Sequence, residues 1–231
     1  MLHLERLGTT GRLAAGLAHD LRNIILPFHY LDSELRNSGV APEVMETVNV
    51  GLRGFMNMVS TLETLRGFAR GGRLDVKQES LDPGAVVRDA VAIARLDMRY
   101  RERRVTVRLD EGLPRLGDDR QKLTQVLVNL VQNAVQATAV GQAIGIEAGT
   151  RGDSVLLAVD DEGPGVPPAL QSQLFAPFVT SKGEQGMGMG LYMARLIVEG
   201  HSGSILCSDR PGGGARFEVL LPLVRATPPA V

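Results

Sequence analysis

The sequence predicts an α+β protein in which an antiparallel helical hairpin precedes a sandwich with helices on one face of a sheet. Two observations support this fold class. Apolar residues recur in steps of three and four along residues 1–70, which is the spacing of packed helices. After Gly71-Gly72 the pattern changes to alternating strands and helices, which is typical of a layered domain. We therefore predict two domains, 1–72 and 73–231.

Two apolar seams define the predicted hairpin, and residues 37–42 (Asn-Ser-Gly-Val-Ala-Pro) separate them because glycine and proline end helices. The first seam comprises Leu4, Leu7, Gly11, Ala14, Ala18, Leu21, Ile25 and Phe28, and the second Met45, Val48, Leu52, Phe55, Val59 and Leu62. Two helices cannot enclose a core alone, so we expect a homodimer through residues 1–70 that forms a four-helix bundle. The alternative is a hairpin that packs on its own chain.

In the second domain we predict strands at 105–109, 144–148, 155–159 and 217–221, and helices at 83–98, 120–138 and 190–200. The stretch 123–146 has no charged residue, and a membrane-spanning helix needs roughly 20 apolar residues. Several glutamines and asparagines interrupt it. We therefore interpret it as a helix and a loop, and expect no membrane segment in this chain.

Bulk composition excludes some classes of function. At 231 residues the chain is long enough to bury a core, and its net charge of -1 gives no reason to expect nucleic acid or an anionic membrane as the main partner. The single Cys207 excludes an intrachain disulfide and a multi-cysteine metal site. Charged residues near the N-terminus (Glu5, Arg6 and Arg12) argue against a signal peptide, so we expect a reducing, cytoplasmic location.

The first helix carries a candidate nucleophile. His19 is followed by Asp20, and Asn23 lies one turn later on the same helix face. A neutral imidazole has a free lone pair on one ring nitrogen, and Asp20 can accept a hydrogen bond from the other. Such a carboxylate stabilises the positive charge that develops when the imidazole attacks. His29 is the rival, but Tyr30 follows it; a surface histidine beside a helix seam is the plain alternative.

Several motifs follow in the second domain. They are Asn129-Leu-Val-Gln-Asn133, Asp161-Glu-Gly163-Pro-Gly165, Phe175-Ala-Pro-Phe178 and Gly186-Met-Gly188-Met-Gly190-Leu191. Their order, together with the His19 segment, resembles the sensor histidine kinases over nearly the whole chain. That resemblance implies a dimerising hairpin with a phosphorylated histidine, joined to a GHKL-type ATP-binding domain. It also implies ATP and Mg²⁺ as cofactors and a response-regulator receiver domain as partner.

The resemblance assigns a role to each motif. Asn133 supplies an amide oxygen to Mg²⁺, a hard ion that takes oxygen ligands, and Asn129 supports the site from one turn earlier; a helix that is merely polar on one side is the alternative. Asp161 accepts a hydrogen bond from the adenine amino group. Its neighbour Asp160 competes for that role, but the Asp-X-Gly-X-Gly spacing of Asp161, Gly163 and Gly165 favours Asp161. An ordinary turn would also contain Asp and Gly.

The three glycines at 186, 188 and 190 let backbone N–H groups approach phosphate oxygens, and the helix that begins near Leu191 adds favourable partial charge. Their spacing is neither the dinucleotide fingerprint nor a Gly-Lys-Ser/Thr loop. Gln136 stands where many relatives carry a basic residue, so Lys182 is the candidate for balancing phosphate charge. The segment between Phe178 and Gly186 leaves room for only a short lid.

The histidine segment departs from the commoner family pattern. Asp20 stands where glutamate is frequent, and Ile24 stands where proline often kinks the helix; Pro27 follows three residues later. By the resemblance, Asn23 positions water for dephosphorylation of the regulator. Two other readings stay open: a GHKL protein that hydrolyses ATP or phosphorylates serine, like mismatch-repair ATPases or anti-sigma kinases, and a non-catalytic ATP-binding dimeric scaffold.

Overall fold

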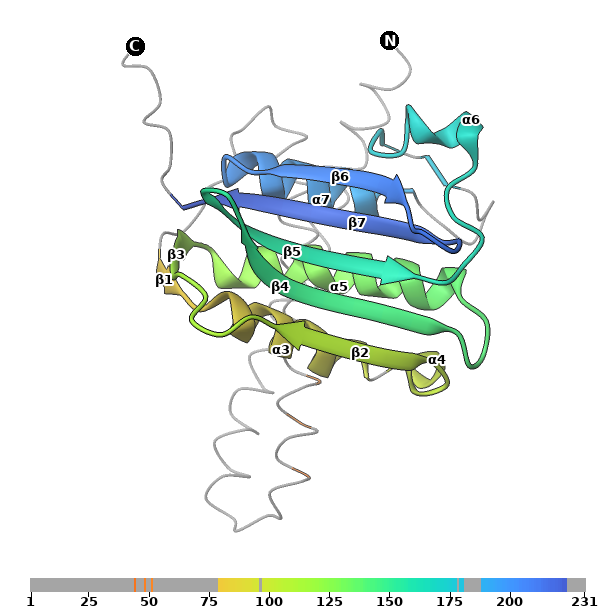
Figure 1. Ribbon diagram of the computed structural model, residues 1–231, viewed down its shortest axis with the longest axis horizontal. Helices are drawn as coiled ribbons and strands as arrows, with labels where there is room; N and C mark the ends of the chain where they lie inside the picture. The colour runs from red at the N-terminus through yellow and green to blue at the C-terminus, as the bar shows by residue number, and fades with distance from the viewer. Residues whose placement is uncertain are drawn as a thin grey trace, which may run out of the picture. The chain divides into compact units, whose positions relative to one another are not determined.

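A five-stranded mixed sheet organises the C-terminal part of the chain (Figure 1). The computed structural model describes residues 79–95, 97–177, 179–180 and 188–223, together with positions 44, 48 and 51. The chain divides into two units, Met1–Asp75 and Val76–Val231, and the fold given below is that of the second unit. Apart from the three isolated positions, the predicted hairpin of residues 1–72 lies outside the described residues.

The strand order of the main sheet is β2-β4-β5-β7-β6. These strands are β2 (Arg104–Leu109), β4 (Ala143–Arg151), β5 (Ser154–Asp161), β7 (Ala215–Pro222) and β6 (Ser204–Asp209). β2 runs parallel to β4, and the remaining neighbours are antiparallel. The four predicted strands are all present. β6 at the edge was not predicted, nor was the small antiparallel pair of β1 (Glu79–Leu81) and β3 (Leu116–Asp118).

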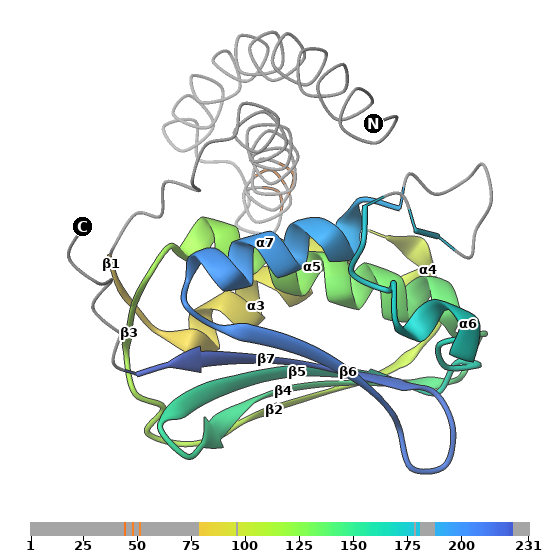
Figure 2. The same ribbon diagram turned by 90° about the horizontal axis from the view of Figure 1, so that it is seen from above.

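Three helices cover one face of this sheet (Figure 2). They are α3 (Pro83–Ala94), α5 (Arg120–Ala137) and α7 (Gly190–Gly200). The helices α4 (Met98–Arg101) and α6 (Pro168–Gln171) are short, with four residues each. The helix layer and the inward face of the sheet bury a core of leucine, isoleucine and valine. This arrangement confirms the predicted sandwich with helices on one face.

Capping side chains fix where the helices begin and end. Asp82 precedes α3 and accepts a hydrogen bond from the Gly84 N–H at 2.9 Å, and Asp119 caps α5 by accepting from the Lys122 N–H at 3.1 Å. The helix predicted at 83–98 is shorter, since Asp97 is extended and caps α4 through the Arg99 N–H. Arg103 donates to the Val135 and Thr138 carbonyl oxygens at the end of α5, where a cation is favourable.

The uncharged stretch 123–146 is divided among α5, a loop and the start of β4. Among the described residues, we find no helix with the length and apolar character needed to cross a membrane. This agrees with the interpretation of that stretch as a helix and a loop.

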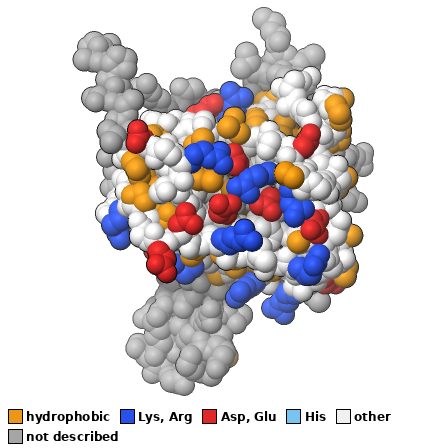
Figure 3. All heavy atoms as spheres, viewed as in Figure 1, with side chains coloured by type: hydrophobic (Ala, Val, Ile, Leu, Met, Phe, Trp, Pro, Cys, Tyr) orange, Lys and Arg blue, Asp and Glu red, His pale blue; other side chains and the backbone are white. Residues whose placement is uncertain are grey.

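The other face of the sheet carries acidic and basic side chains side by side (Figure 3). Arg216 on β7 forms ion pairs with Glu147 at 2.8 Å, Asp160 at 2.9 Å and Glu218 at 2.9 Å, and Arg151 pairs with Glu218 at 2.7 Å. Hydrogen bonds from Arg151 and Arg216 lower the pKa of Glu218 to about 2 against the opposing effect of burial. The open face is thus neutralised locally by cross-strand pairs.

Candidate functional site

A cavity of about 320 Å³ lies where α5, α7 and the end of β5 meet. Asn133, Gln136 and Ala137 line it from α5, Asp161 from β5, and Ala215 and Phe217 from β7; residues 188–191 line it from the start of α7. Apolar residues between β5 and α7 complete the wall: Val166, Pro167, Leu170, Leu174 and Val179. Residues that lie far apart in the sequence therefore converge on one concave site.

Of the predicted site residues, the cavity brings together Asn133, Asp161, Gly165, Gly188, Gly190 and Leu191. Gly163 and Asn129 do not line the cavity but contact residues that do. Lys182 and Gly186 lie outside the described residues, as do His19, Asp20 and Asn23. The predicted lid between Phe178 and Gly186 is described only at residues 179–180, and Phe175 lines a different cavity, between α6 and β6.

Strand alternation separates Asp161 from Asp160, its competitor. Asp161 pairs with the buried Ile144 and points to the helix side of the sheet, where it is 3 % exposed. Asp160 pairs with Gly145 and points to the open face, where Arg216 donates to it at 2.9 Å. Only Asp161 lines the cavity.

The Asp161 carboxylate is buried but hydrogen-bonded. It accepts from the Gly163 N–H at 2.8 Å and from the Ala215 N–H. Burial raises its pKa from the ordinary value of 3.8; the two backbone donors and Arg210 oppose that rise, while Asp160 adds to it. A buried acceptor of this kind suits a ligand that brings its own N–H donor.

Gly163 explains how the end of β5 comes close to α5. A Cβ atom at this position would lie 2.8 Å from the Ala137 carbonyl oxygen, so any larger residue would push the loop away from the helix. The first glycine of the Asp-X-Gly-X-Gly motif therefore serves a close backbone approach, and the cavity wall depends on it.

Asn129 joins two of the site's elements. Its side-chain amide donates to the Gly190 carbonyl oxygen at 3.2 Å, which ties the middle of α5 to the first turn of α7. Asn133, one turn further along α5, lines the cavity itself. The two asparagines thus share a helix face, with Asn129 supporting and Asn133 exposed to the cavity.

The start of α7 has no side-chain cap, and its first residues line the cavity. The first N–H groups of a helix have no partner within the helix, and the helix dipole places positive partial charge there. This end of the cavity therefore favours an anionic group. The opposite end, bounded by Asp161, Ala215 and Phe217, combines one buried carboxylate with an apolar wall.

Sequence patterns had not pointed to the apolar wall. Phe217 was predicted only as a strand residue, although its alternation with the buried Ala215 and Val219 would have placed it on the inward face. Leu170 and Leu174 lie in a segment without a helical or strand period, so no sequence signal placed them at the site.

Comparison with known proteins agrees with this geometry. Residues 118–225 match the family described as "Histidine kinase-, DNA gyrase B-, and HSP90-like ATPase". The signal transduction histidine-protein kinase AtoS of Escherichia coli K12 is 32% identical over 224 residues, which are 96% of this chain and 36% of AtoS. The sensor histidine kinase ZraS of Escherichia coli O157:H7 is 30% identical over 227 residues, 96% of this chain and 48% of ZraS.

Solved structures give the same result. The catalytic domain of the histidine kinase ThkA superposes with a TM-score of 0.58 and 30% identity, covering 63% of this chain and 95% of the ThkA domain. The sheet, the helix layer and the cavity therefore define an ATP-binding domain of the GHKL type.

The chain belongs to the histidine kinases. It spans about a third of the length of AtoS and about half that of ZraS.

Proposed function

We propose that this chain is an ATP-dependent protein histidine kinase core that phosphorylates its own His19. The phosphoryl group then passes to an aspartate of a response-regulator receiver domain. One observation carries the proposal: Asn133 and Asp161, singled out by different motifs, line one cavity together with the start of α7. A regulator phosphatase activity that uses Asn23 accompanies the kinase activity in this proposal.

ATP fits the two ends of the cavity. Adenine would lie against Phe217 and Ala215 with its amino group donating to Asp161, and the phosphates would lie toward Gly188, Gly190 and the start of α7. The full-length ShkA structure, in complex with AMPPNP, is 25% identical and covers 95% of this chain with a TM-score of 0.61. That similarity supports a nucleotide at the corresponding place.

The residues present fit Mg²⁺ as well. Within the described part of the chain there is no cluster of three or more His, Cys, Asp or Glu side chains that could hold a metal ion. In the proposed function a magnesium ion would take one protein oxygen, from Asn133, and its remaining ligands from phosphate and water, which is a common arrangement for this ion. When bound, it would neutralise negative charge on the phosphates.

The chemistry assigned to the chain is an in-line displacement. The unprotonated ring nitrogen of His19 attacks the γ-phosphorus, a P–N bond forms, the bond to the β-phosphate oxygen breaks, and ADP leaves. Asp20 stabilises the positive imidazole, and Lys182 balances charge on the transferred group. A receiver aspartate then attacks the phosphohistidine and releases the free imidazole.

We further propose that residues 1–72 form the dimerising hairpin and residues 73–231 the catalytic domain. The two apolar seams support this division, and they predict a homodimer through residues 1–70. A cytoplasmic location is part of the same proposal, because ATP and receiver domains are available there.

Two other functions compete with this one. A GHKL ATPase or serine kinase would need no His19-Asp20-X-X-Asn23 arrangement, and a non-catalytic scaffold would need neither that arrangement nor Asn133. The presence of every one of these residues favours the histidine kinase.

Labelling with γ-labelled ATP tests the proposal. His19→Gln is expected to abolish labelling while leaving ATP affinity within about twofold of the parent, since the two sites belong to different predicted domains. His29→Gln is the matched control and should label normally. The label should be acid-labile, as phosphohistidine is. Acid-stable labelling, or undiminished labelling of His19→Gln, would refute the assignment.

A further inference from the structure

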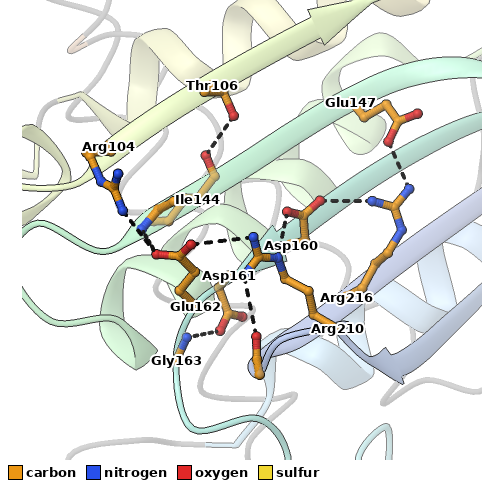
Figure 4. Close-up of polar contacts among 12 residues, drawn as sticks. Arg104, Thr106, Ile144, Glu147, Asp160, Asp161, Glu162, Gly163, Arg210 and Arg216 are labelled. Carbon is orange, nitrogen blue, oxygen red and sulfur yellow. Dashed lines mark hydrogen bonds and ion pairs between the residues drawn. The ribbon is translucent and has the colours of Figure 1, made fainter.

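Arg210, in the hairpin between β6 and β7, pairs with acidic side chains at the end of β5. Arg210 lies between Asp160 and Glu162, the residues on either side of Asp161: its Nε is 3.6 Å from Asp160 Oδ2, and its Nη2 is 3.5 Å from Glu162 Oε1 (Figure 4). Its side chain is 28% exposed, so the guanidinium is partly shielded from solvent. The Arg210 backbone N–H also donates to the Gly214 carbonyl oxygen at 3.1 Å, which closes the hairpin.

The same hairpin delivers a hydrogen-bond donor to Asp161. Gly214 packs directly on the Asp161 backbone, and a Cβ atom there would overlap the Asp161 carbonyl oxygen. The next residue, Ala215, donates its N–H to the Asp161 carboxylate. The position of that donor therefore depends on how the hairpin is held against the strand end.

We propose that Arg210 is a positioning residue for adenine recognition. It bridges the two carboxylates that flank Asp161 on the open face of the sheet, and thereby holds the Ala215 N–H at the Asp161 carboxylate on the opposite face. Arg210 does not line the nucleotide cavity, so it acts through Asp161 and Ala215. This inference rests on the proposed function, in which Asp161 binds the adenine amino group.

Arg210 also acts on the Asp161 carboxylate through its charge. Residues 160–162 are three consecutive acids, and Asp161 is the buried one. Asp160 raises the Asp161 pKa and Arg210 lowers it. From β6, burial raises the pKa of Cys207 to about 11, so that thiol stays neutral and adds no charge. Among the charged groups that act on the Asp161 pKa, Arg210 is the cation, and it opposes the rise that burial and Asp160 cause.

The experiment measures the ATP affinity of the full chain by calorimetry at a series of pH values from mildly acidic to about pH 8. In this range a carboxyl group with a raised pKa loses its proton. Arg210→Gln should bind ATP about two- to fivefold more weakly at neutral pH, the range for a partly exposed ion pair. Its affinity should also decline at a higher pH than in the parent, because Asp161 would protonate more readily. Arg210→Lys keeps the charge but cannot bridge both carboxylates in a fork, so it should keep the parent's pH profile and lose affinity.

Arg151→Gln is the matched control, since Arg151 pairs on the same face with Glu218, away from Asp161. It should leave ATP affinity and its pH profile unchanged. The inference is overturned if the Arg210→Gln profile superimposes on the parent's, or if its affinity falls by the same factor at every pH, which would indicate a merely structural role. A parent chain that binds no ATP, or an Asp161→Asn variant that binds like the parent, would instead overturn the proposed function.

Discussion

At the scale of single residues, Asp161 places function and stability in opposition. A buried carboxylate is costly to ionise, yet the proposed role of Asp161 is to accept a hydrogen bond from the adenine amino group, and an ionised carboxylate is the stronger acceptor. The fold lessens that cost with the N–H groups of Gly163 and Ala215 but does not remove it, since the Asp161 pKa stays raised. In the proposed function, Asp161 therefore serves nucleotide binding at some expense of folding free energy.

Asp161→Asn is expected to show both sides of this conflict. Because the folded state has the raised pKa, it binds more protons than the unfolded state just above pH 3.8, and the parent loses stability as pH rises through that window. The unfolding free energy of the variant, relative to the parent, should therefore increase with pH in the ligand-free protein. ATP affinity should fall by about 1.5–3 kcal/mol as a charged acceptor is lost.

Thermal unfolding across pH, together with calorimetric ATP titration, checks this prediction. Asp153→Asn, in the exposed β4–β5 turn, is the control for removing a carboxylate elsewhere. Parallel pH–stability curves for parent and Asp161→Asn would show that Asp161 is not the titrating group.

Asp20 and Asn23 are predicted to divide kinase and phosphatase chemistry on one helix face. Asp20→Asn should reduce labelling of His19, because it removes the charge that stabilises the imidazolium. Asn23→Ala should leave labelling near the parent's rate and slow dephosphorylation of the regulator. Both rates are measured with the cognate regulator and labelled ATP. The reverse pattern would mean that the two roles are exchanged.

At the scale of elements, a buried histidine couples the end of α7 to the start of α5. His201 is 1% exposed; its Nδ1 lies 2.7 Å from the Ile197 carbonyl oxygen, and its Nε2 accepts from the Asp119 N–H at 3.4 Å. These contacts require a neutral ring with the proton on Nδ1. His201 thereby satisfies backbone groups from two helices that both contribute to the nucleotide cavity.

His201→Leu should lower the unfolding free energy by about 1–3 kcal/mol, because it fills similar space but removes the ring nitrogen that accepts from the buried Asp119 N–H. The Ile197 carbonyl oxygen keeps the backbone N–H of residue 201 as a donor. Urea denaturation of the ligand-free protein measures the loss. Glu199→Gln, two residues earlier and exposed, is the control and should change stability by less than about 0.5 kcal/mol. Equal stability of His201→Leu and parent would show that the ring contributes only its volume.

The helices and strands differ in how far the local sequence predicts them. The bounds of α5 and β5 were predicted to within two residues, since both have long apolar runs. In addition, Asp119 precedes α5 and Asp161 ends β5. β6 was missed because Ser204–Asp209 shows little alternation and forms by pairing with β7. β1 and β3 are three residues each, and they form only when two segments that are distant in the sequence pair. The break of the 83–98 helix depended on the cap at Asp97.

At the scale of the whole molecule, the division into two units separates the nucleotide site from the predicted phosphoacceptor. Every described site residue belongs to the unit Val76–Val231. That unit has its own buried core, so it does not require the first unit to enclose its apolar face.

A chain beginning at Leu74 should therefore fold as a monomer that binds ATP and does not label itself. Light scattering and calorimetry check its mass and its ATP affinity. The full chain should be a dimer at micromolar concentration. A monomeric full chain would contradict the four-helix bundle, and an unfolded truncated chain would contradict the domain boundary.

The sequence by itself determined the fold class of the second domain. It also indicated Asn133, Asp161, Gly188 and Gly190 as candidate site residues, because apolar period and motif spacing are local properties. Only the tertiary structure decided which of these residues share a cavity, and that Asn129 ties α5 to α7. It also decided that Arg210 reaches both neighbours of Asp161. Such contacts arise from strand order and from packing between distant segments, and no local pattern records which backbone groups will meet.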